Sequence, residues 1–324
     1  MNWRDAIWRF RDSREYLERV RRGFPPLIIC CAITGGVHGA EANPNLPETP
    51  EAQADDMYKA YKAGATAVHV HARDPKTGYA TSAKRTEDFY KVNKLIRERC
   101  PDLIINNTTG AGAGFTVQER LCSLDARPEL ASLDVGAVPL RVKIKKRLPP
   151  LSGRDKDEEI DTFITLNYAE TELYASEMKK RGIKPELEVF YPSQYWYVDN
   201  LIQKKLVDPP YLIQFVMGFA GGGIYATPWN LLQMLDELPS DALFQVIGIG
   251  PDQLPMITMG ILLGGNVRVG FEDNVYYRKG ELTTSNAQLV ERVVRIAHEL
   301  EREVATPAQA REILNISKEP SQYP

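Results

Sequence analysis

Histidine and cysteine are scarce in this sequence, with four of each among 324 residues. The cysteines lie at positions 30, 31, 100 and 122 and lack the paired spacing that is typical of zinc fingers or disulfide frameworks. Cys30 and Cys31 are adjacent within an apolar run, which favours buried, reduced thiols. We therefore expect a cytoplasmic protein that is not stabilised by disulfide bonds.

Long hydrophobic runs and a large net charge are also missing. No apolar stretch approaches the ~20 residues that a membrane span needs, and the charged N-terminus has no signal-peptide core. The formal net charge of −3 provides no general attraction for nucleic acid or anionic membranes. We therefore expect small-molecule partners, with no nucleic acid and no membrane among them.

The N-terminal residues have a pattern of their own. Trp3, Ile7, Phe10 and other apolar side chains recur at helical spacing through residues 1–24, among many arginines. Acidic residues interleave with the arginines, which argues against a helix on a membrane surface. The pattern predicts one amphipathic helix, an extension over residues 1–25 that packs on the barrel flank or on a neighbouring subunit.

From residue 26 onward, short apolar segments alternate with segments of helical periodicity. Eight strands are predicted, at 27–34, 66–72, 103–109, 130–137, 184–190, 211–217, 243–249 and 267–272. Helices are predicted between them, at 50–63, 86–99, 168–181, 228–238, 254–263 and 286–303. Eight strands in right-handed βαβ units can close a barrel. We therefore predict an α/β fold, a (β/α)8 TIM barrel over residues 26–318 with an N-terminal helical extension.

Polar side chains recur at the carboxyl ends of these strands, where barrel enzymes place their catalytic groups. The eighth strand carries Arg268, Gly270 and Glu272 on one face by the period of two, followed by Asp273. Unpaired charge inside an apolar barrel is costly, so this pattern favours a functional site. The polar residues of the other strands are Thr34, His69, His71, Asn107, Thr108, Thr109, Ser132, Asp134, Glu188 and Gln214.

Two of the four histidines, His69 and His71, fall together at the end of the second strand. Residues two apart project from the same face of a strand, so the imidazoles lie side by side like two ligands of one metal ion. Two imidazoles and a carboxylate form the open ligand set of catalytic zinc. Glu272 is our candidate third ligand, and Asp273 is the alternative. Core histidines bonded to backbone carbonyls, or an ion pair of Glu272 with Arg268, are the structural alternatives.

Longer motifs extend this pattern in one order along the chain. They are PLIICCAITGG, NPNLPETPEAQA, AVHVHAR, NTTGAG, PELASLDVG, KPELEVF, QFVMG, VRVGFEDNVYYRKG and SNAQLVERVVRIA. Through them, from about Pro26 to Leu314, the sequence resembles the β-keto acid cleavage enzymes. The resemblance implies a zinc-dependent, usually tetrameric barrel that converts a β-keto acid and acetyl-CoA into acetoacetate and an acyl-CoA. It implies metal-assisted addition, CoA transfer and retro-Claisen cleavage, with one Zn²⁺ per subunit and acetyl-CoA as cosubstrate.

The resemblance also implies roles for individual residues. The metal ligands fall on His69, His71 and Glu272. The catalytic positions fall on Asp273 and Arg268, which act together in the proton chemistry, and on the active-site glutamate, Glu188. The substrate-binding positions are Thr108, where relatives have serine, and Ser132, where a relative has threonine, together with the neighbouring Thr34, Val37, Thr109 and Gly110.

One departure from the family pattern bears on the substrate. Where the aminohexanoate enzyme has an acidic side chain for the substrate amino group, this chain has Val37. Valine cannot pair with an ammonium group, so we expect 3-keto-5-aminohexanoate to be a poor substrate. Another acidic position becomes Pro192, in an aromatic stretch over residues 190–197. These aromatics either pack a helix on the barrel or form a pocket for an apolar or quaternary-ammonium tail.

Two segments are weaker candidates for binding coenzyme A. A basic run from Arg141 to Arg147 opens a stretch over residues 138–165 that we interpret as an irregular insertion relative to shorter relatives. The run is either a solvated face or a source of cations for phosphates. The glycine-rich loop 218–223 either approaches a phosphate or forms a tight turn. The alternative functions are a CoA-independent zinc aldolase or lyase on the same barrel, and a non-catalytic barrel that keeps the metal site.

Overall fold

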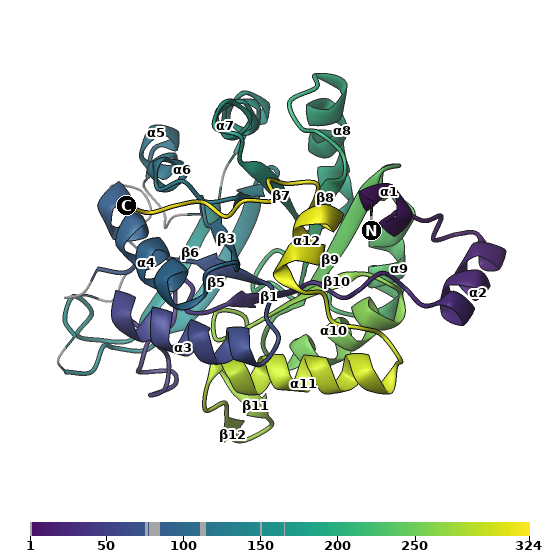
Figure 1. Cartoon of the computed structure of the whole chain (residues 1–324). Helices are drawn as coiled ribbons and strands as arrows, with labels where there is room; N and C mark the ends of the chain where they lie inside the picture. The colour runs from purple at the N-terminus through teal and green to yellow at the C-terminus, as the bar shows by residue number, and fades with distance from the viewer. Residues whose placement is uncertain (1, 75–76, 78–84, 111–114, 150, 165) are drawn as a thin grey trace.

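A computed structural model describes residues 2–74, 77, 85–110, 115–149, 151–164 and 166–324. Its centre is a closed barrel of eight parallel strands in the order β1-β10-β9-β8-β7-β4-β3-β2 (Figure 1). The strands are β1 (Ile29–Ala32), β2 (Ala67–Val70), β3 (Ile104–Asn107), β4 (Leu130–Asp134), β7 (Lys184–Val189), β8 (Tyr211–Met217), β9 (Ala242–Gly248) and β10 (Asn266–Val269). All eight predicted strands form, which confirms the predicted (β/α)8 barrel.

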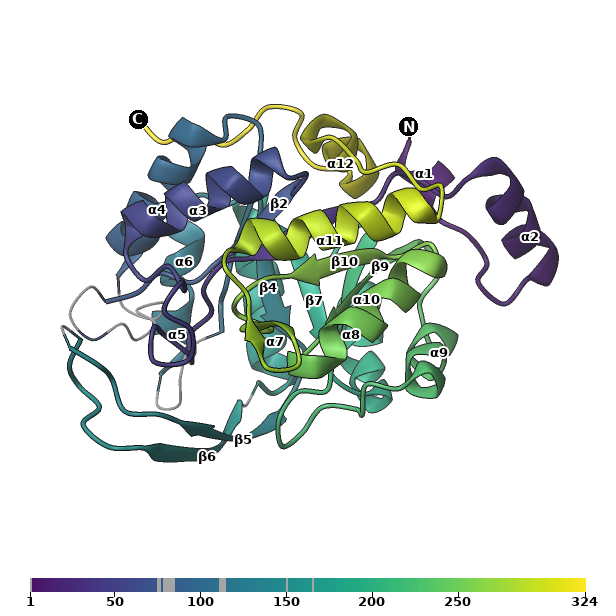
Figure 2. The same ribbon diagram turned by 90° about the horizontal axis from the view of Figure 1, so that it is seen from below.

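Helices surround the barrel and cover its outer face (Figures 1 and 2). Each predicted helix forms, but the one predicted to end at residue 303 ends at Glu299, because Glu301 turns left-handed with a φ of 54°. None of the helices in the described part of the chain has the length and apolar character of a membrane span. The helices are α3 (Pro50–Lys62), α4 (Thr86–Arg99), α5 (Val117–Arg120), α6 (Cys122–Asp125), α7 (Tyr168–Lys180), α8 (Tyr195–Gln203), α9 (Pro228–Asp236), α10 (Gln253–Leu262), α11 (Asn286–Glu299) and α12 (Pro307–Leu314).

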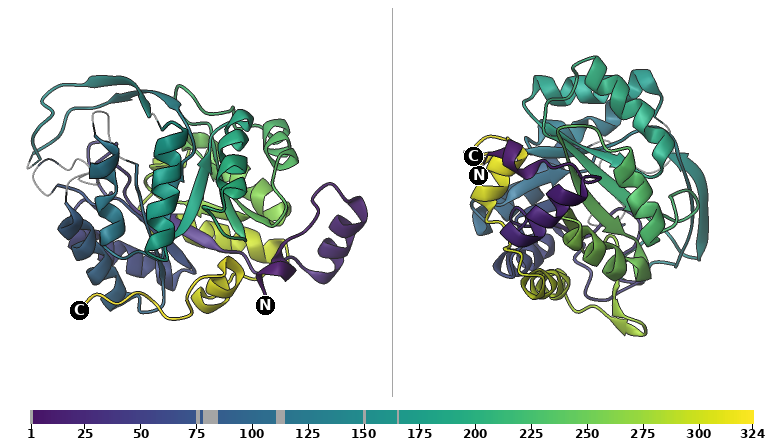
Figure 3. Two further views of the ribbon diagram at one scale, coloured as in Figure 1. Left: turned by 90° about the horizontal axis from the view of Figure 1, so that it is seen from above. Right: turned by 90° about the vertical axis from the view of Figure 1, so that its right-hand side faces the viewer.

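The N-terminal extension forms two helices, so the prediction of one continuous helix is wrong. α1 (Trp3–Ala6) ends where Ile7 becomes extended, and α2 (Ser13–Arg22) begins after Asp12. The Asp12 carboxylate accepts from two amides in the first turn of α2, and this cap replaces a continuous helix at that point. α1 packs beside α12, whereas α2 stands away from the barrel (Figure 3).

The segment between β4 and α7 is regular, which corrects the interpretation of an irregular stretch. It forms an antiparallel hairpin of β5 (Val138–Ile144) and β6 (Glu158–Ile164), with Arg141 opposite Asp161 and Lys143 opposite Glu159. Apolar and charged residues alternate in both strands, and this period of two produces the pairing. The positive charges of the basic run do not by themselves indicate it. A second, short hairpin of β11 (Tyr276–Arg278) and β12 (Glu281–Leu282) precedes α11.

Apolar packing lies mainly outside the barrel, between strands and helices. One buried cluster joins β1, β2, β3 and β10 to α3, α4 and α11, and a second joins β4, β7, β8 and β9 to α7, α8 and α9. A third cluster joins Leu130, Leu212 and Leu243 to α12 and closes the amino-terminal end of the lumen. Stability therefore comes from the outward strand faces and from this closed end, and the other end of the lumen is available to polar groups.

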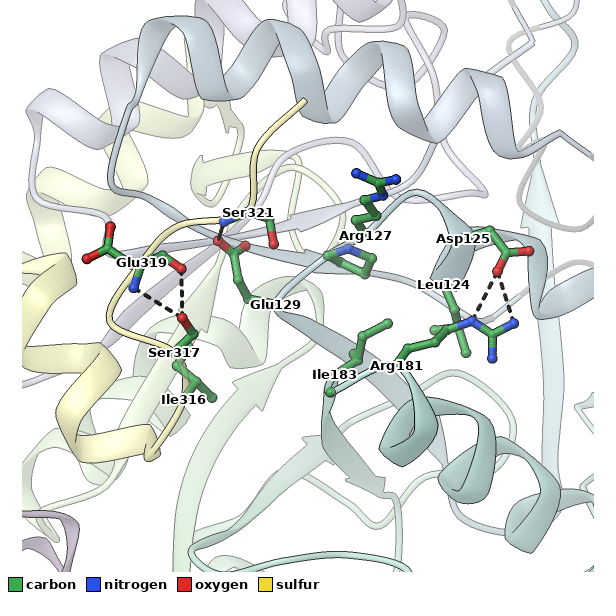
Figure 4. Close-up of a pocket in the computed structure, with 12 residues that line it drawn as sticks. Leu124, Asp125, Arg127, Glu129, Arg181, Ile183, Ile316, Ser317, Glu319 and Ser321 are labelled. Carbon is green, nitrogen blue, oxygen red and sulfur yellow. Dashed lines mark hydrogen bonds and ion pairs between the residues drawn. The ribbon is translucent and has the colours of Figure 1, made fainter. Parts of the chain in front are cut away.

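One buried carboxylate, that of Glu129, ties the closed end of the barrel to the C-terminal tail. It accepts from Arg97 Nη2 at 2.7 Å, from Arg311 Nη2 at 2.9 Å and from the Ser321 amide at 2.9 Å. Glu129 also lines a surface pocket of about 490 Å³ beside that tail (Figure 4). The pocket lies at the amino-terminal ends of β4 and β7, so it is remote from the predicted site residues.

We expect Glu129→Gln to lower the free energy of unfolding by about 3 kcal/mol or more, because it leaves two buried guanidinium groups without a carboxylate. Asp125→Asn is the matched control, because Asp125 is 55% exposed and pairs with Arg181 at 3.0 Å at the same pocket. For the control we expect a change within about 0.5 kcal/mol. Urea unfolding followed by circular dichroism measures both, and equal losses in the two variants would contradict this role of Glu129.

Candidate active site

Three potential metal ligands meet where β2 and β10 end. His69 lies in β2, His71 follows it, and Glu272 follows β10 after a turn. The Nε2 atoms of His69 and His71 lie 3.6 Å and 3.3 Å from Glu272 Oε1. One ligand atom from each residue falls within 4.8 Å of the others, so the group could hold one metal ion.

Two glycines let Glu272 approach the histidines. Gly270 has a φ of 149°, and a Cβ at this position would lie 2.1 Å from the carbonyl oxygen of Ala32. Gly35 has a φ of 68°, and its Cβ would lie 2.6 Å from Glu272 Cγ. Both positions therefore exclude a side chain. As a result, the loop between β1 and α3 packs directly against the residue that completes the histidine group.

The donor atoms of this group fit a divalent cation. Glu272 Oε2 and the Nδ1 atoms of both histidines are buried without a hydrogen-bond partner among the described residues. Burial holds the pKa of His69 well below its usual range, so this imidazole is neutral, as a metal ligand must be. Burial acts against ionisation of Glu272, but the charge of Arg268 and the interactions with His71 and His69 together outweigh it and hold the pKa of that carboxyl well below its usual range. Two imidazoles and one carboxylate match the donor set of open zinc sites.

Arg268, in β10, holds the carboxylates of the site together. Its Nη2 donates to Glu272 Oε1 at 2.7 Å and to Asp273 Oδ1 at 2.8 Å, and its Nε donates to Asp273 Oδ2 at 3.1 Å. Its Nη1 lies 3.4 Å from Glu188 Oε1. The structure thus brings Glu272 to the histidines and turns Asp273 toward Arg268. Glu272 is at the same time an ion-pair partner of Arg268, so the two interpretations of this residue are compatible.

Asp273 is buried beside this guanidinium. Burial raises the pKa of Asp273 to about 6, although the charge of Arg268 and its hydrogen bonds act in the opposite direction. A carboxylate with this pKa is a stronger base than an exposed aspartate. Because Arg268 contacts both oxygens of Asp273, the carboxylate is also fixed in orientation.

A second carboxyl pair lies on β4 and β7. Asp134 and Glu188 are register partners, and their side chains are hydrogen-bonded to each other. Burial raises the pKa of both groups, and the charge of Asp134 adds to the rise at Glu188, so the pair favours sharing a proton. Gln214 Nε2 donates to Glu188 Oε1 at 2.7 Å and orients it.

Glu186 lies below this pair and is a buried carboxyl that the predicted site residues do not include. Amide groups of Asn106, Gln214 and Gln245 donate to it at 2.8, 3.0 and 3.0 Å. These donors form a polar layer beneath the candidate ligands. Glu186 and Glu188 are two apart on one face of β7, and this alternation is the sequence signal that could have identified Glu186.

The predicted substrate-binding hydroxyls differ in what they contact. The hydroxyl of Thr34 donates to the carbonyl of Pro47 at 2.9 Å, and that of Thr109 donates to the carbonyl of Ser132 at 2.6 Å. Both are therefore engaged in positioning the backbone. The hydroxyl of Thr108 accepts from the Gly110 amide at 2.9 Å and shapes the turn after β3. Thr34 follows β1, and Thr108, Thr109 and Gly110 follow β3, at the same end of the barrel as the histidines, whereas Ser132 lies within β4.

Val37 lies in the loop between β1 and α3, two residues beyond Gly35, and is half-buried. Arg73 fastens this loop to the segment that carries the histidines. Its Nε donates to the carbonyl of Gly35 at 2.7 Å, and its Nη2 donates to the carbonyls of Thr34, at 3.0 Å, and His38. Arg73 Nη1 also lies 3.8 Å from Glu48 Oε1. The predicted site residues do not include Arg73, because the acceptors of these hydrogen bonds are backbone carbonyls, which every residue has.

The aromatic stretch over residues 190–197 serves mainly to pack helices. Phe190 and Tyr195 are buried, and Tyr197 stacks on Tyr168 with ring centroids 4.1 Å apart. Trp196 is 72% exposed on α8. These contacts favour the helix-packing interpretation over a pocket for a substrate tail.

Both coenzyme A candidates contain residues that make contacts within the protein, and Lys143, Lys145 and Lys146 of the basic run are exposed. Lys143 lies 3.8 Å from Glu159, and Arg147 lies buried, 2.8 Å from Glu41. In the glycine-rich loop, a Cβ on Gly222 would lie 2.3 Å from Pro139 Cγ, so this glycine allows close packing against β5. Both observations favour the structural alternatives for these segments.

Comparison with known sequences agrees with this geometry. A family described as beta-keto acid cleavage enzyme matches residues 26–316. The chain is 41% identical over 292 residues to the 3-keto-5-aminohexanoate cleavage enzyme of Acetoanaerobium sticklandii, covering 90% of this chain and 99% of that protein. It is 35% identical over 297 residues to the 3-oxoadipate:acetyl-CoA acetyltransferase of Cupriavidus necator, covering 90% and 95%. It is 31% identical over 299 residues to the 3-dehydrocarnitine:acetyl-CoA trimethylamine transferase of Rhizobium meliloti, covering 90% and 97%.

Among solved structures, the chain is similar to the binary complex of ObcA with oxaloacetate. The TM-score is 0.63 at 19% sequence identity, covering 85% of this chain and 68% of that chain. At this identity the likeness supports the barrel fold alone.

Proposed function

Because the chain belongs to the β-keto acid cleavage enzyme family, we propose that it converts a β-keto acid and acetyl-CoA into acetoacetate and a new acyl-CoA. In this reaction the acetyl group joins C2 of the acid, and the bond between C2 and C3 of the acid breaks. Acetoacetate therefore keeps C1 and C2 of the acid, and the remaining acyl group leaves on the coenzyme. The names of two relatives, which include acetyl-CoA, support this cosubstrate.

The observation that carries the proposal is the junction of two groups at Arg268. One group, His69, His71 and Glu272, has the donors of a catalytic zinc site. The other is Asp273, whose pKa is raised by burial. Arg268 Nη2 donates to both Asp273 and Glu272. A β-keto acid needs both, since its carboxylate and ketone oxygens suit one dication and its C2 proton needs a base.

The three ligands would hold one zinc ion, which supplies a Lewis acid for the carboxylate and ketone oxygens of the substrate. Asp273 removes the C2 proton, and C2 then attacks the carbonyl carbon of acetyl-CoA and expels the coenzyme A thiolate. The thiolate attacks the original ketone carbon, the C2–C3 bond breaks, and Asp273 returns its proton to C2. Arg268 holds Asp273 by both oxygens throughout, so one carboxyl acts first as base and then as acid.

We assign Glu188 a role at the departing acyl group. The pair with Asp134 favours a shared proton, and we propose that Glu188 turns this proton from Asp134 to the ketone oxygen when the substrate binds. Its contacts with Gln214 and Arg268 hold it beside the other catalytic groups. We place the hydroxyls of Thr108 and Ser132 against the substrate oxygens.

The substrate class follows from the β1–α3 loop. Val37 stands in this loop, which packs on Glu272 through Gly35. A valine here favours an acyl chain without a primary ammonium group, because it offers no charge to pair with. We therefore propose a β-keto acid with an uncharged chain.

We also propose a cytoplasmic homotetramer. Trp196, Tyr225 and Trp229 are 72%, 82% and 78% exposed on and near α8 and α9, which supports a face that another subunit covers. The four free cysteines support a reducing compartment.

Zinc binding should depend on the histidine pair. We expect about one zinc ion per chain, and we expect His71→Ala to lower zinc affinity at least ~100-fold, because it removes a ligand rather than a supporting contact. His298→Ala is the matched control, since His298 is exposed on α11. Competition with a chromophoric chelator measures both. Unchanged affinity in His71→Ala would refute the proposed ligand set.

The proton chemistry should depend on Asp273. Asp273→Asn keeps the size of the side chain but removes the base, so we expect acetoacetate formation with acetyl-CoA to fall by about 100-fold to 10,000-fold at full zinc occupancy. The assay quantifies acetoacetate and acyl-CoA by mass spectrometry over a panel of β-keto acids. Near-native turnover in Asp273→Asn would exclude this residue as the base. Product formation without acetyl-CoA would favour the CoA-independent lyase.

Residue 37 should set the preference for the acyl chain. We expect Val37→Glu to raise kcat/KM for 3-keto-5-aminohexanoate relative to 3-ketohexanoate by at least about tenfold, because a carboxylate there can pair with the ammonium group. Val37→Gln is the control for size and polarity, and it should leave the ratio within about threefold of the native value. Efficient cleavage of the amino substrate by the native chain would contradict this assignment.

A further inference from the structure

The β5–β6 hairpin bridges loops that lie far apart on the barrel. It leaves the end of β4, which stands three strands away from β1 in the closed barrel. It extends along one side of the barrel (Figure 2). At one end it contacts the loop after β8, and at the other it contacts the loop after β1. The hairpin follows β4, so it and the two loops that it contacts all lie at the carboxyl ends of the strands. The hairpin can therefore affect how these loops are positioned.

The base of the hairpin packs tightly on the loop after β8. The Arg141 amide donates to the carbonyl of Ala220 at 3.2 Å. A Cβ on Gly221 would lie 2.6 Å from the Arg141 nitrogen. The glycines of this loop therefore allow a backbone contact between two mouth loops.

The tip is fastened by a buried ion cluster, the latch, which consists of Glu41, Glu48, Arg147 and Arg154. The side chains of both arginines are 0% exposed, and that of Glu41 is 3% exposed. Arg147 Nη1 lies 2.8 Å from Glu41 Oε2 and 3.0 Å from Glu48 Oε1, and Arg154 Nη2 lies 2.8 Å from Glu41 Oε1. The two arginines come from the hairpin and the two glutamates from the β1–α3 loop. Breaking such a buried pair is costly, whereas exposed pairs on the same hairpin contribute little.

The same carboxylates hold the backbone of the β1–α3 loop. The Gly39 amide donates to Glu41 Oε1 at 3.0 Å, and the Ala40 amide donates to Glu48 Oε1 at 3.3 Å. Arg73 holds the other side of this loop through the carbonyls of Gly35 and His38. Val37 therefore lies between two fastened points, one from the histidine segment and one from the hairpin.

Gly39 shows how tightly the latch is built. A Cβ there would lie 1.8 Å from Arg147 Nη1 and 2.1 Å from Glu48 Oε1. Any side chain at this position must displace the ion pair, even with all four charges present. Gly39→Ala is therefore a way to open the latch without removing a charge.

We propose that the latch residues Glu41, Glu48, Arg147 and Arg154 are positioning residues for substrate selection. By fastening the hairpin to the β1–α3 loop, they set the position of Val37 in the loop that packs on Glu272 through Gly35, and so the affinity for the β-keto acid. The proposal rests on the proposed function. It assigns the buried part of the basic run to positioning of this loop rather than to phosphate binding.

The test compares Glu41→Gln and Gly39→Ala with Asp161→Asn in the zinc-loaded full chain. Asp161 is the matched control, because it is a 72% exposed carboxylate on the same hairpin, 3.9 Å from Arg141. Binding of 3-ketohexanoate without acetyl-CoA is measured by calorimetry, backbone hydrogen exchange by mass spectrometry, and kcat and KM with acetyl-CoA.

For both latch variants we expect hydrogen exchange over residues 36–48 to accelerate at least about tenfold and the Kd for 3-ketohexanoate to rise at least about tenfold. We expect kcat within about threefold of the native value, unchanged zinc stoichiometry, and no change in Asp161→Asn. Faster exchange with an unchanged Kd would show that the latch only stabilises the fold and would overturn the proposal, as would unchanged exchange. A native chain that binds the β-keto acid but forms no acetoacetate would refute the proposed reaction and leave the latch test valid. If Glu41→Gln fails to fold, Gly39→Ala decides, because it keeps every charge.

Discussion

The guanidinium of Arg268 is the interaction on which the candidate site depends. It reaches Glu272, Asp273 and Glu188 within 3.4 Å, inside a lumen where isolated carboxylates would protonate or repel one another. Because Arg268 keeps Glu272 ionised beside a neutral imidazole, the donor set suits a dication. Because it holds both oxygens of Asp273, this carboxylate is fixed in one orientation. Glu272, one of the candidate metal ligands, and Asp273, the proposed base, are thus positioned by one side chain.

The barrel can hold this charge because its strands carry apolar side chains on their outward faces and polar side chains on their lumen faces. Their outward residues pack against helices in two apolar clusters, and the third cluster closes the amino-terminal end. The amide donors to Glu186 then form a layer between that apolar floor and the carboxylates above. Each of the three amide groups in this layer donates to Glu186, which lowers the cost of a charged lumen. The carboxyl-terminal end of the barrel can therefore be polar while the apolar clusters keep the fold stable.

The parts of this arrangement that follow local periodicity could be predicted from the sequence. The strands, and the shared face of His69 and His71, follow from a period of two. The break at Asp12 depends on a single cap, and the role of Arg73 depends on carbonyl partners that any residue could supply. The latch joins residues about a hundred positions apart, so the basic run gave no sign that Arg147 would be buried against Glu41. Such long-range pairings depend on the closed barrel and the hairpin, which place the two loops together.

The central claim is that Asp273 makes C2 of the β-keto acid a nucleophile toward acetyl-CoA beside the metal group. The most direct measurement uses acetyl-CoA labelled with ¹³C at its carbonyl carbon, the zinc-loaded protein and 3-ketohexanoate, with both products followed by NMR and mass spectrometry. We expect label only at C3 of acetoacetate, with an equal amount of unlabelled butyryl-CoA. Label in the butyryl-CoA, or acetoacetate without label, would contradict the claim.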